Sequence, residues 1–444
     1  SSINGMIYMR GQSADYDNWL QLGNDGWGWK DILHYFKKSE DYYAGPDEIH
    51  NIGGEWRVEK QRLSWDVLDK FRDACAEAGI QKINDFNRGN NEGSSYFRVN
   101  QRSGWRLNTS KAFLRPAKSR KNLKIITHAQ VERIEIEKGR ATGVTFKRKE
   151  KSYTATANKE VLLAAGAINS PQLLQLSGIG NAEYLSNLGI DVVHNLPGVG
   201  ENLQDHLQIR CAYKVSGIKT LNETTRSLWD KLRIGLNYVI KRSGPMSMAP
   251  SQLGVFTKSD PSQKTPDLEF HIQPLSLDKF GDELDPFPAI TASVCNLRPE
   301  SRGHVRITST NPLDHPEISP NYLSTEQDRI TAARSIRIAR NLVSQDALSP
   351  YKPEEFRPGS DYQTDEELVI AAGNIGTTIF HPVGTAKMGH DAMSVVDDKL
   401  RVHGIKGLRV IDASIMPTIT SGNTNSPVIM IAEKGADMIL EENE

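Results

Sequence analysis

Three segments near the end of the chain carry side chains suited to moving a proton and a hydride. They supply the imidazole of His381, the neutral amide of Asn423, and a helix start at Ser426-Pro427 whose first backbone N–H groups have no partner inside the helix. Oxidising an alcohol requires a base for the hydroxyl proton, a hydrogen bond to the oxyanion, and positive potential beside the electron acceptor. The residues therefore predict alcohol oxidation at a redox cofactor of the flavin kind.

Each of these side chains also has an ordinary structural interpretation. A histidine between Phe380 and Pro382 can be a core residue bonded to the backbone, and an asparagine after Ser421-Gly422 can occupy a left-handed turn. An imidazole with its usual pKa near 6.5 accepts a proton at neutral pH, whereas an amide does not titrate. One base and one hydrogen-bond donor are the chemical roles that remain open to the pair.

The composition favours small-molecule chemistry. The chain has 444 residues, enough for two hydrophobic cores, and a formal net charge of -1, which gives no general attraction to nucleic acid or to an anionic membrane. Its three cysteines have neither zinc nor disulfide spacing, so we expect reduced thiols. Mean hydropathy is -0.50 and no run of about 18 apolar residues occurs, so we expect no membrane-spanning helix. Asp205-His206 lacks a third ligand at suitable spacing, so we predict a structural hydrogen bond there and no metal site.

Hydrophobic patterns predict two kinds of structure. Strand-length runs occur at 123–127, 131–137, 141–146, 161–165 and 408–411. The run at 161–165 is apolar throughout, as in a buried parallel strand. After it we expect a helix with Ser170 as N-cap and Pro171 as first helical residue, ending near Gly178.

The middle of the chain, between residues 207 and 365, has a different pattern. Proline-bearing loops separate candidate strands at 268–272, 290–294 and 304–308, which favours an antiparallel sheet with a helix at 328–344 beside it. A last amphipathic helix is expected from Ser426-Pro427 to about Leu440.

Four motifs in order along the chain carry a family resemblance. They are Ser1-Ser2-Ile3-Asn4 with Tyr8, Gly11 and Asp17, then Gly166-Ala167-Ile168-Asn169-Ser170-Pro171 through Ser177-Gly178-Ile179-Gly180, then Gly198-Val199-Gly200-Glu201-Asn202-Leu203-Gln204-Asp205-His206, and finally His381 and Asn423 with their surroundings. Together they resemble the glucose-methanol-choline (GMC) oxidoreductases over nearly the full length of the chain.

The resemblance implies a mixed α/β and α+β architecture. We expect an FAD-binding Rossmann-like part at 1–206, an antiparallel-sheet substrate domain at 207–374, and a return to the FAD domain at 375–444 that carries the histidine and asparagine. By the same resemblance His381 is the catalytic base and Asn423 donates a hydrogen bond to the substrate oxygen. Contacts to FAD are implied at Asn4, Gly5, Val131, Asp412, Ala413, Asn425 and Pro427. Ile3 stands where some members carry a flavin-linked histidine, so non-covalent FAD is expected.

One element of the family pattern is absent. The resemblance implies a GxGxxG fingerprint ahead of Ser1, and Gly198-Val199-Gly200 does not replace it because the third glycine and a following helix are missing. We therefore expect the sequence to be truncated by at least one βαβ unit, roughly 30 residues or more. We also expect weak FAD binding or none by this chain alone. An inactive or ligand-binding protein of this fold is the alternative function.

The substrate prediction depends on one position. In the alignment with choline-oxidising relatives, Gln252 stands where those enzymes hold a quaternary ammonium with an acid, and Met246 and Met248 lie close by. A neutral primary alcohol is therefore expected, with choline as the alternative substrate.

The residues do not distinguish oxygen from a quinone or a carrier protein as electron acceptor, and resemblance to bacterial members favours a dehydrogenase. We expect a cytoplasmic or peripheral membrane location. A hydrolase is disfavoured because neither GxSxG nor HExxH occurs.

Overall fold

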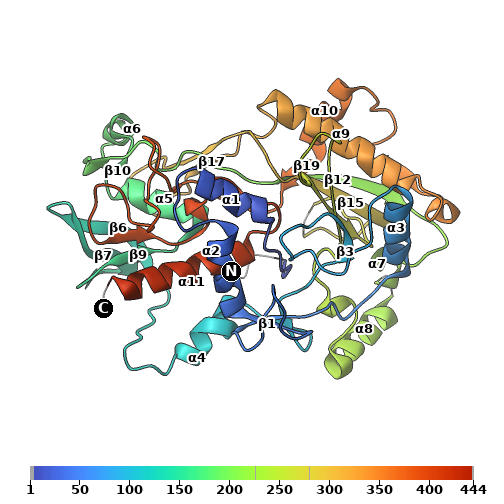
Figure 1. Ribbon diagram of the computed structural model, residues 1–444, viewed down its shortest axis with the longest axis horizontal. Coiled ribbons are helices and arrows are strands. Elements are labelled where there is room, and N and C mark those ends of the chain that lie inside the picture. The colour runs from blue at the N-terminus through green and yellow to red at the C-terminus, as the bar shows by residue number, and fades with distance from the viewer. Residues whose placement is uncertain (1–4, 226, 280, 443–444) are drawn as a thin grey trace.

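The computed structural model describes residues 5–225, 227–279 and 281–442. Two halves lie side by side along the long axis of the molecule (Figure 1). The half on the left of the view carries most of the chain before β12 (Leu207–Lys214) together with the C-terminal residues, and the half on the right is built on a large sheet.

Helices, a short parallel strand pair and a three-stranded antiparallel sheet make up the left half. Its helices are α1 (Ser13–Gln21), α2 (Trp29–Ser39), α5 (Gly166–Leu176), α6 (Ala182–Asn187) and α11 (Asn425–Glu441), and its strands are β6 (Gln130–Glu137), β7 (Arg140–Arg148), β8 (Lys151–Thr156), β9 (Val161–Leu163) and β20 (Leu408–Val410). The predicted strands at 161–165 and 408–411 pair in parallel as β9 and β20, and β6, β7 and β8 form an antiparallel sheet.

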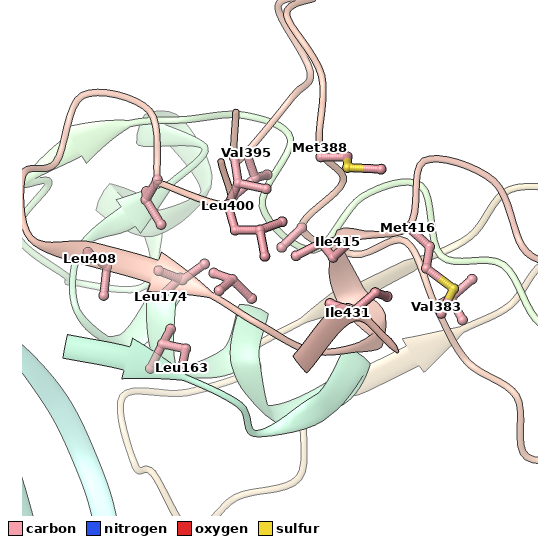
Figure 2. Close-up of a cluster of buried hydrophobic side chains, with 14 of the residues drawn as sticks. Leu163, Leu174, Val383, Met388, Val395, Leu400, Leu408, Ile415, Met416 and Ile431 are labelled. Carbon is pink, nitrogen blue, oxygen red and sulfur yellow. The ribbon is translucent and has the colours of Figure 1, made fainter. Parts of the chain in front are cut away.

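The core of this half joins segments that are far apart in the sequence. Leu163 of β9, Leu174 of α5, Leu408 of β20 and Ile431 of α11 belong to one buried hydrophobic cluster (Figure 2). Because strand β9, its following helix and the C-terminal helix share this core, burial fixes the start of α5 and the start of α11 relative to each other.

Two local predictions for this half were wrong. Residues 123–127 are irregular, and the described chain places no strand beside them to share ladder hydrogen bonds. Helix α5 starts at Gly166, with Pro171 inside it. The Gly166 N–H donates to Asp412 Oδ2 at 2.9 Å, and the Ser170 hydroxyl lies 2.6 Å from the same oxygen. The carboxylate of Asp412, two residues after β20, therefore does the capping that the sequence had assigned to Ser170.

Among the described residues, a seven-stranded antiparallel sheet forms the right half. In order its strands are β18 (Glu354–Arg357), β12, β15 (Ala289–Asn296), β14 (Leu268–Gln273), β13 (Leu253–Thr257) and β3 (Gly93–Tyr96), and β19 (Gly376–Thr378) also pairs with β12. The predicted strands at 268–272 and 290–294 and the predicted helix at 328–344 are confirmed as β14, β15 and α9 (Glu326–Val343). Because β3 and β19 come from outside 207–374, the sheet extends beyond that range, and the domain boundaries stay a prediction.

Both faces of the sheet are buried, and they differ in polarity. Phe270, Ile272 and Val294 point to an apolar core that also contains residues of α3 (Asp66–Glu77), α9 and α10 (Asp365–Ile375). Strand side chains alternate between faces, so Glu269 and His271 point the opposite way, and both are buried as well. The sheet therefore turns a buried polar face away from its helices.

Smaller elements complete the chain. They are the strand pairs β1 (Glu40–Tyr42) with β2 (Trp56–Val58), β4 (Gln101–Arg102) with β5 (Trp105–Arg106), β10 (Ile179–Gly180) with β11 (His194–Asn195) and β16 (His304–Arg306) with β17 (Glu317–Ser319), the helices α4 (Arg115–Ala117), α7 (Leu221–Thr224) and α8 (Leu228–Lys241), and the short helical turns Ser110–Leu114, Pro245–Ser247, Ser349–Tyr351 and Ala413–Ile415. The three cysteines are buried free thiols. Within the described ranges no helix combines the length and apolar character that crossing a bilayer requires.

Candidate active site

The pairing of β12 with β19 brings two distant histidines together. Leu207 lies opposite Thr378, and Gln204 forms the next bridge with Val383. Between these pairs, residues 205–206 stand opposite residues 379–382, so the second strand carries extra residues and bulges. Phe380 has a φ of 67°, the left-handed region that a bulky residue seldom adopts. The bulge directs His381 out of the ladder, as bulges beside functional sites do.

A buried carboxyl group holds this bulge in place. Asp205 Oδ1 accepts a hydrogen bond from the His381 N–H at 2.8 Å, and Oδ2 accepts from the hydroxyls of Tyr322 and Thr378. Burial raises the pKa of Asp205 from its usual value, and these donors oppose that shift. The structural hydrogen bond predicted for Asp205 is confirmed, and no group of metal-ligating side chains occurs among the described residues.

The His381 ring lies between two polar partners. Its Nδ1 is 3.1 Å from His206 Nδ1, and its Nε2 is 3.1 Å from the Asn423 side-chain nitrogen. An amide nitrogen only donates, so Nε2 accepts and must carry a lone pair. The proton of the neutral ring then sits on Nδ1, which donates to His206. The structure therefore brings His381 and Asn423 into contact, with His381 Nε2 unprotonated.

Burial keeps both imidazoles neutral. The pKa of His381 is lowered well below its usual value, first because the ring is desolvated and then because His206 and His271 lie near. Desolvation likewise lowers the pKa of His206 to about 4. At neutral pH His381 is therefore present in its proton-accepting form.

The loop that carries Asn423 is anchored from the other end of the chain. The carboxyl group of Asp15 in α1 accepts from the Ser421 N–H and from the Ser421 hydroxyl, both at 2.7 Å. Asn91 donates to the Ser421 carbonyl at 3.1 Å. Gly422 follows with a φ of 148°, and Asn423 then turns toward His381. The position of the amide thus depends on contacts more than 300 residues away in the chain.

A cavity of about 680 Å³ surrounds the pair. His381 and Asn423 line it together with Gly5, Asp412, Ala413 and Asn425. Its volume falls within the range of about 300–1,000 Å³ that is usual for small-molecule and cofactor sites. Six of the nine residues predicted for the site therefore border one space.

The remaining three predicted site residues lie elsewhere. Asn4 is outside the described residues. Val131 lies on β6, paired with Phe146, and is not part of the cavity lining. Pro427 is buried in the first turn of α11 and is also not part of that lining. Their roles stay predictions.

The lining suits a cofactor with an anionic diphosphate and a polar edge. Helices α5 and α11 both begin at the cavity, through Gly166 and Ala167 and through Asn425, and helix N-termini favour negative charge. The side-chain oxygens of Asn423 and Asn425 are buried without hydrogen-bond partners in the described part of the chain. The Asp412 carboxylate already caps the start of α5, whereas no described side chain caps the start of α11. The uncapped start of α11 and two unused acceptors at one cavity fit FAD, which combines phosphates with ring N–H groups.

Asp412 has a more restricted role than its type suggests. Its carboxyl oxygens take hydrogen bonds from Gly166, Ser170 and Ser414. With both oxygens engaged inside the protein, a contact from Asp412 to a cofactor falls to its backbone. Gly384 also packs against the protein, since a Cβ there would come within 2.6 Å of the Asn202 carbonyl. The lack of a side chain at this position is therefore explained by contact with the protein backbone.

The glycines of Gly198-Val199-Gly200 also serve internal packing. A Cβ on Gly198 would lie 2.1 Å from the Met393 carbonyl, and one on Gly200 would lie 2.2 Å from the Val305 carbonyl. Both glycines are therefore required where backbone passes against backbone.

Sequence reasoning missed the polar face of the sheet. Both oxygens of Glu269 and both ring nitrogens of His271 are buried without hydrogen-bond partners among the described residues. Glu269 Oε1 comes within 3.2 Å of His271 Nε2, in an alignment too poor for a hydrogen bond. The signal was present in Leu268-Glu269-Phe270-His271-Ile272, where apolar and polar residues alternate on a strand buried on both sides.

Comparison with known proteins agrees with this geometry. The GMC oxidoreductase family is matched at residues 1–208 by its N-terminal domain and at residues 299–432 by its C-terminal domain. Mitochondrial choline dehydrogenase of Homo sapiens is 40% identical over 441 residues, which are 99% of this chain and 74% of that protein. Oxygen-dependent choline dehydrogenase of Escherichia coli O139:H28 is 41% identical over 444 residues, 99% of this chain and 80% of that protein.

A solved structure extends the likeness to the fold. An FAD-dependent oxidoreductase from Chaetomium thermophilum superimposes with a TM-score of 0.91 at 26% identity, covering 99% of this chain and 85% of that one. The family match covers most of the sequence, and the two choline dehydrogenases are similar along nearly all of it. The chain belongs to the GMC oxidoreductases, a family of FAD-dependent flavoproteins that act on CH–OH groups.

Proposed function

We propose that this protein oxidises a primary alcohol to an aldehyde, with His381 taking the hydroxyl proton. The observation that carries the proposal is the contact of 3.1 Å between His381 Nε2 and the Asn423 amide nitrogen, two residues that line the cavity. An incoming hydroxyl replaces the amide at Nε2, donates its proton there, and accepts a hydrogen bond from the same amide. As the O–H bond breaks, its electron pair forms the carbonyl bond and hydride leaves the carbon.

The cavity lining supports FAD as the cofactor and supplies the residues proposed to hold it. FAD, when bound, supplies the acceptor for that hydride. Gly5, Ala413 and Asn425 border the space, and the N-terminus of α11, which no side chain of the described residues caps, contributes positive potential. His206 accepts the hydrogen bond that His381 donates from Nδ1, and this contact keeps the lone pair of His381 on Nε2. Asp205 holds the bulge that aims the ring, so it is a positioning residue.

A neutral alcohol is the proposed substrate, because Gln252 is not an acid. Its amide donates to the Ala249 carbonyl and the residue is fully buried. Choline remains a second candidate on two grounds. The curated relatives at 40% and 41% identity are choline dehydrogenases. The Glu269 carboxyl group is buried without a hydrogen-bond partner in the described chain, and its charge acts to raise the pKa of His206, which contacts His381.

Substrate kinetics separate these candidates. We expect the FAD-loaded protein to have a higher kcat/KM for 1-butanol than for choline, with the aldehyde as product. A strong preference for choline would reject the neutral alcohol. In that case Glu269→Gln should raise the KM for choline while the KM for 1-butanol stays unchanged, and Gln252→Glu tests whether an acid at the other position improves choline binding.

The competing function is a ligand-binding protein of this fold that does not hold FAD. It predicts a purified protein without flavin absorbance and without aldehyde formation from any alcohol. Flavin bands that are lost on addition of alcohol would exclude it.

A further inference from the structure

Helix α8 carries an apolar stripe that the fold leaves uncovered. None of its residues is buried. Leu228 is 83% exposed, Trp229 80% and Ile240 75%, and Leu232, Leu236 and Val239 are each more than half exposed. At 3.6 residues per turn these six side chains fall within one arc of about 120°. Contiguous exposed apolar surface of this kind is rare on monomeric proteins and marks an interaction site.

The opposite side of the helix is the one that contacts the protein. Tyr238 donates from its hydroxyl to the Gly104 carbonyl at 3.3 Å, and the Asn237 amide donates to the Ser243 carbonyl at 3.1 Å. Asp230, the acidic residue of the helix, bonds to the N-cap Ser227, and at about 100° per residue it falls outside the apolar arc. The apolar stripe therefore faces away from the protein and contains no acid.

Basic residues border the stripe. Arg233 follows one edge of the apolar arc and Lys231 lies beyond the other, and both are exposed. At the C-terminal end, the Arg242 guanidinium lies 4.3 Å from the ring centre of Trp105, a half-exposed tryptophan that continues the apolar surface. A stripe of Leu, Val, Ile and Trp edged by Lys and Arg is the pattern of a helix that lies in the interface of an anionic membrane.

A second positive segment lies along the same edge of the molecule. Between Arg106 and Glu132 the chain has six lysines and arginines and no acidic residue. This segment includes α4, and α4 and α8 both lie along the lower edge in Figure 1. The net charge of -1 for the whole chain therefore conceals a local surface that anionic lipid headgroups attract.

We infer that α8 docks the protein on the surface of an anionic lipid bilayer, with the stripe from Leu228 to Ile240 entering the headgroup region. A second copy of the chain suits the surface less well. A two-fold pairing of α8 with α8 would bring Lys231 and Arg233 of both copies together, and like charges at an interface repel.

Vesicle co-sedimentation of the full chain tests the inference. We use vesicles of phosphatidylcholine alone and vesicles in which part of it is replaced by phosphatidylglycerol. The protein should sediment with the second kind and far less with the first. Replacing Trp229→Glu and Leu232→Glu together should weaken the partition by at least about 100-fold, because two anchoring side chains are lost. Ile370→Glu, which changes a residue 60% exposed on α10, is the matched control and should bind as wild type does.

Three results would overturn the inference. The first is wild-type protein that stays in the supernatant with both kinds of vesicle, and the second is binding that the double α8 variant retains. The third is a dimer, seen without vesicles by sedimentation velocity, that the double variant dissolves, since α8 would then be an interface between copies. Equal melting temperatures of wild type and variant exclude unfolding as the cause of lost binding.

Discussion

The Nδ1 atoms of His206 and His381 lie 3.1 Å apart, although the residues are 175 positions apart in the chain. One of the two nitrogens must donate, and the Asn423 amide at the far side of His381 requires that His381 be the donor. The contact therefore selects the tautomer that leaves Nε2 free to act as a base. The β12–β19 pairing, with its bulge, creates this contact.

Removing the base should nearly abolish turnover. We expect His381→Ala to lower kcat by about 100-fold or more, the usual contribution of a general base. His315→Ala, which changes an exposed histidine outside the cavity, serves as control and should leave kcat unchanged. A His381→Ala enzyme with kcat near that of wild type would show that another group takes the proton.

A charge at position 423 should move the acid limb of the pH–rate profile up into the neutral range. The Asn423→Asp carboxylate would lie beside Nε2 and raise the pKa of His381, so the base would be protonated at neutral pH and activity would recover as pH rises. Asn423→Ala removes only the hydrogen bond to the oxyanion and should lower kcat by roughly 100-fold at every pH. Parallel pH profiles for the two variants would contradict the contact.

The histidine pair should set the acid limb of the pH–rate profile. Since the pKa of His381 is lowered well below its usual value, kcat/KM should stay level from neutral pH down past the ordinary histidine range. His206→Asn keeps an acceptor for Nδ1 but removes the neighbouring imidazole, so the limb should move to higher pH. His271→Asn should move it less, because His271 is the smaller contributor. A shift to lower pH in His206→Asn would oppose this account.

Folding stability should also depend on these rings. The pKa of His206 is about 4 in the folded protein against about 6.5 unfolded, so the unfolded chain binds the extra proton between these values. Stability is therefore present above pH 6.5 and lost as pH falls, by up to about 3 kcal/mol at pH 4 from this group. Urea unfolding at several pH values should show a shallower decline for His206→Asn. An unchanged slope would mean that the ring is solvated in the folded state.

Hydrophobic patterns in the sequence predicted the strands whose burial leaves a regular period. The apolar run at Val161 and the alternating run at Leu268 gave strands where they occur, because burial on one or two faces leaves a period in the sequence. Ser170 misled the helix prediction because the residue that caps this helix, Asp412, lies 242 residues further along the chain. The strand predicted at 123–127 failed for a similar reason, because strand formation requires a neighbouring strand and the described chain places none there.

The candidate site was predictable only in part. Resemblance supplied His381 and Asn423, but the His206 contact depends on strand pairing across 175 residues. Glu269 was missed because an acid in an alternating strand is ordinarily solvent-facing, and only the packed structure shows that both faces are buried. The basic surface around α8 was also missed, because the net charge of the whole chain averages these residues with acidic residues elsewhere in the molecule.

Rapid mixing of the FAD-loaded protein with a primary alcohol under anaerobic conditions tests the central claim most directly. The account predicts loss of flavin absorbance on mixing with 1-butanol, slower when the reacting carbon carries deuterium, and slower by about 100-fold or more in His381→Ala with FAD still bound. Flavin absorbance that alcohol leaves unchanged, or a His381→Ala protein that loses it at the wild-type rate, would contradict the account.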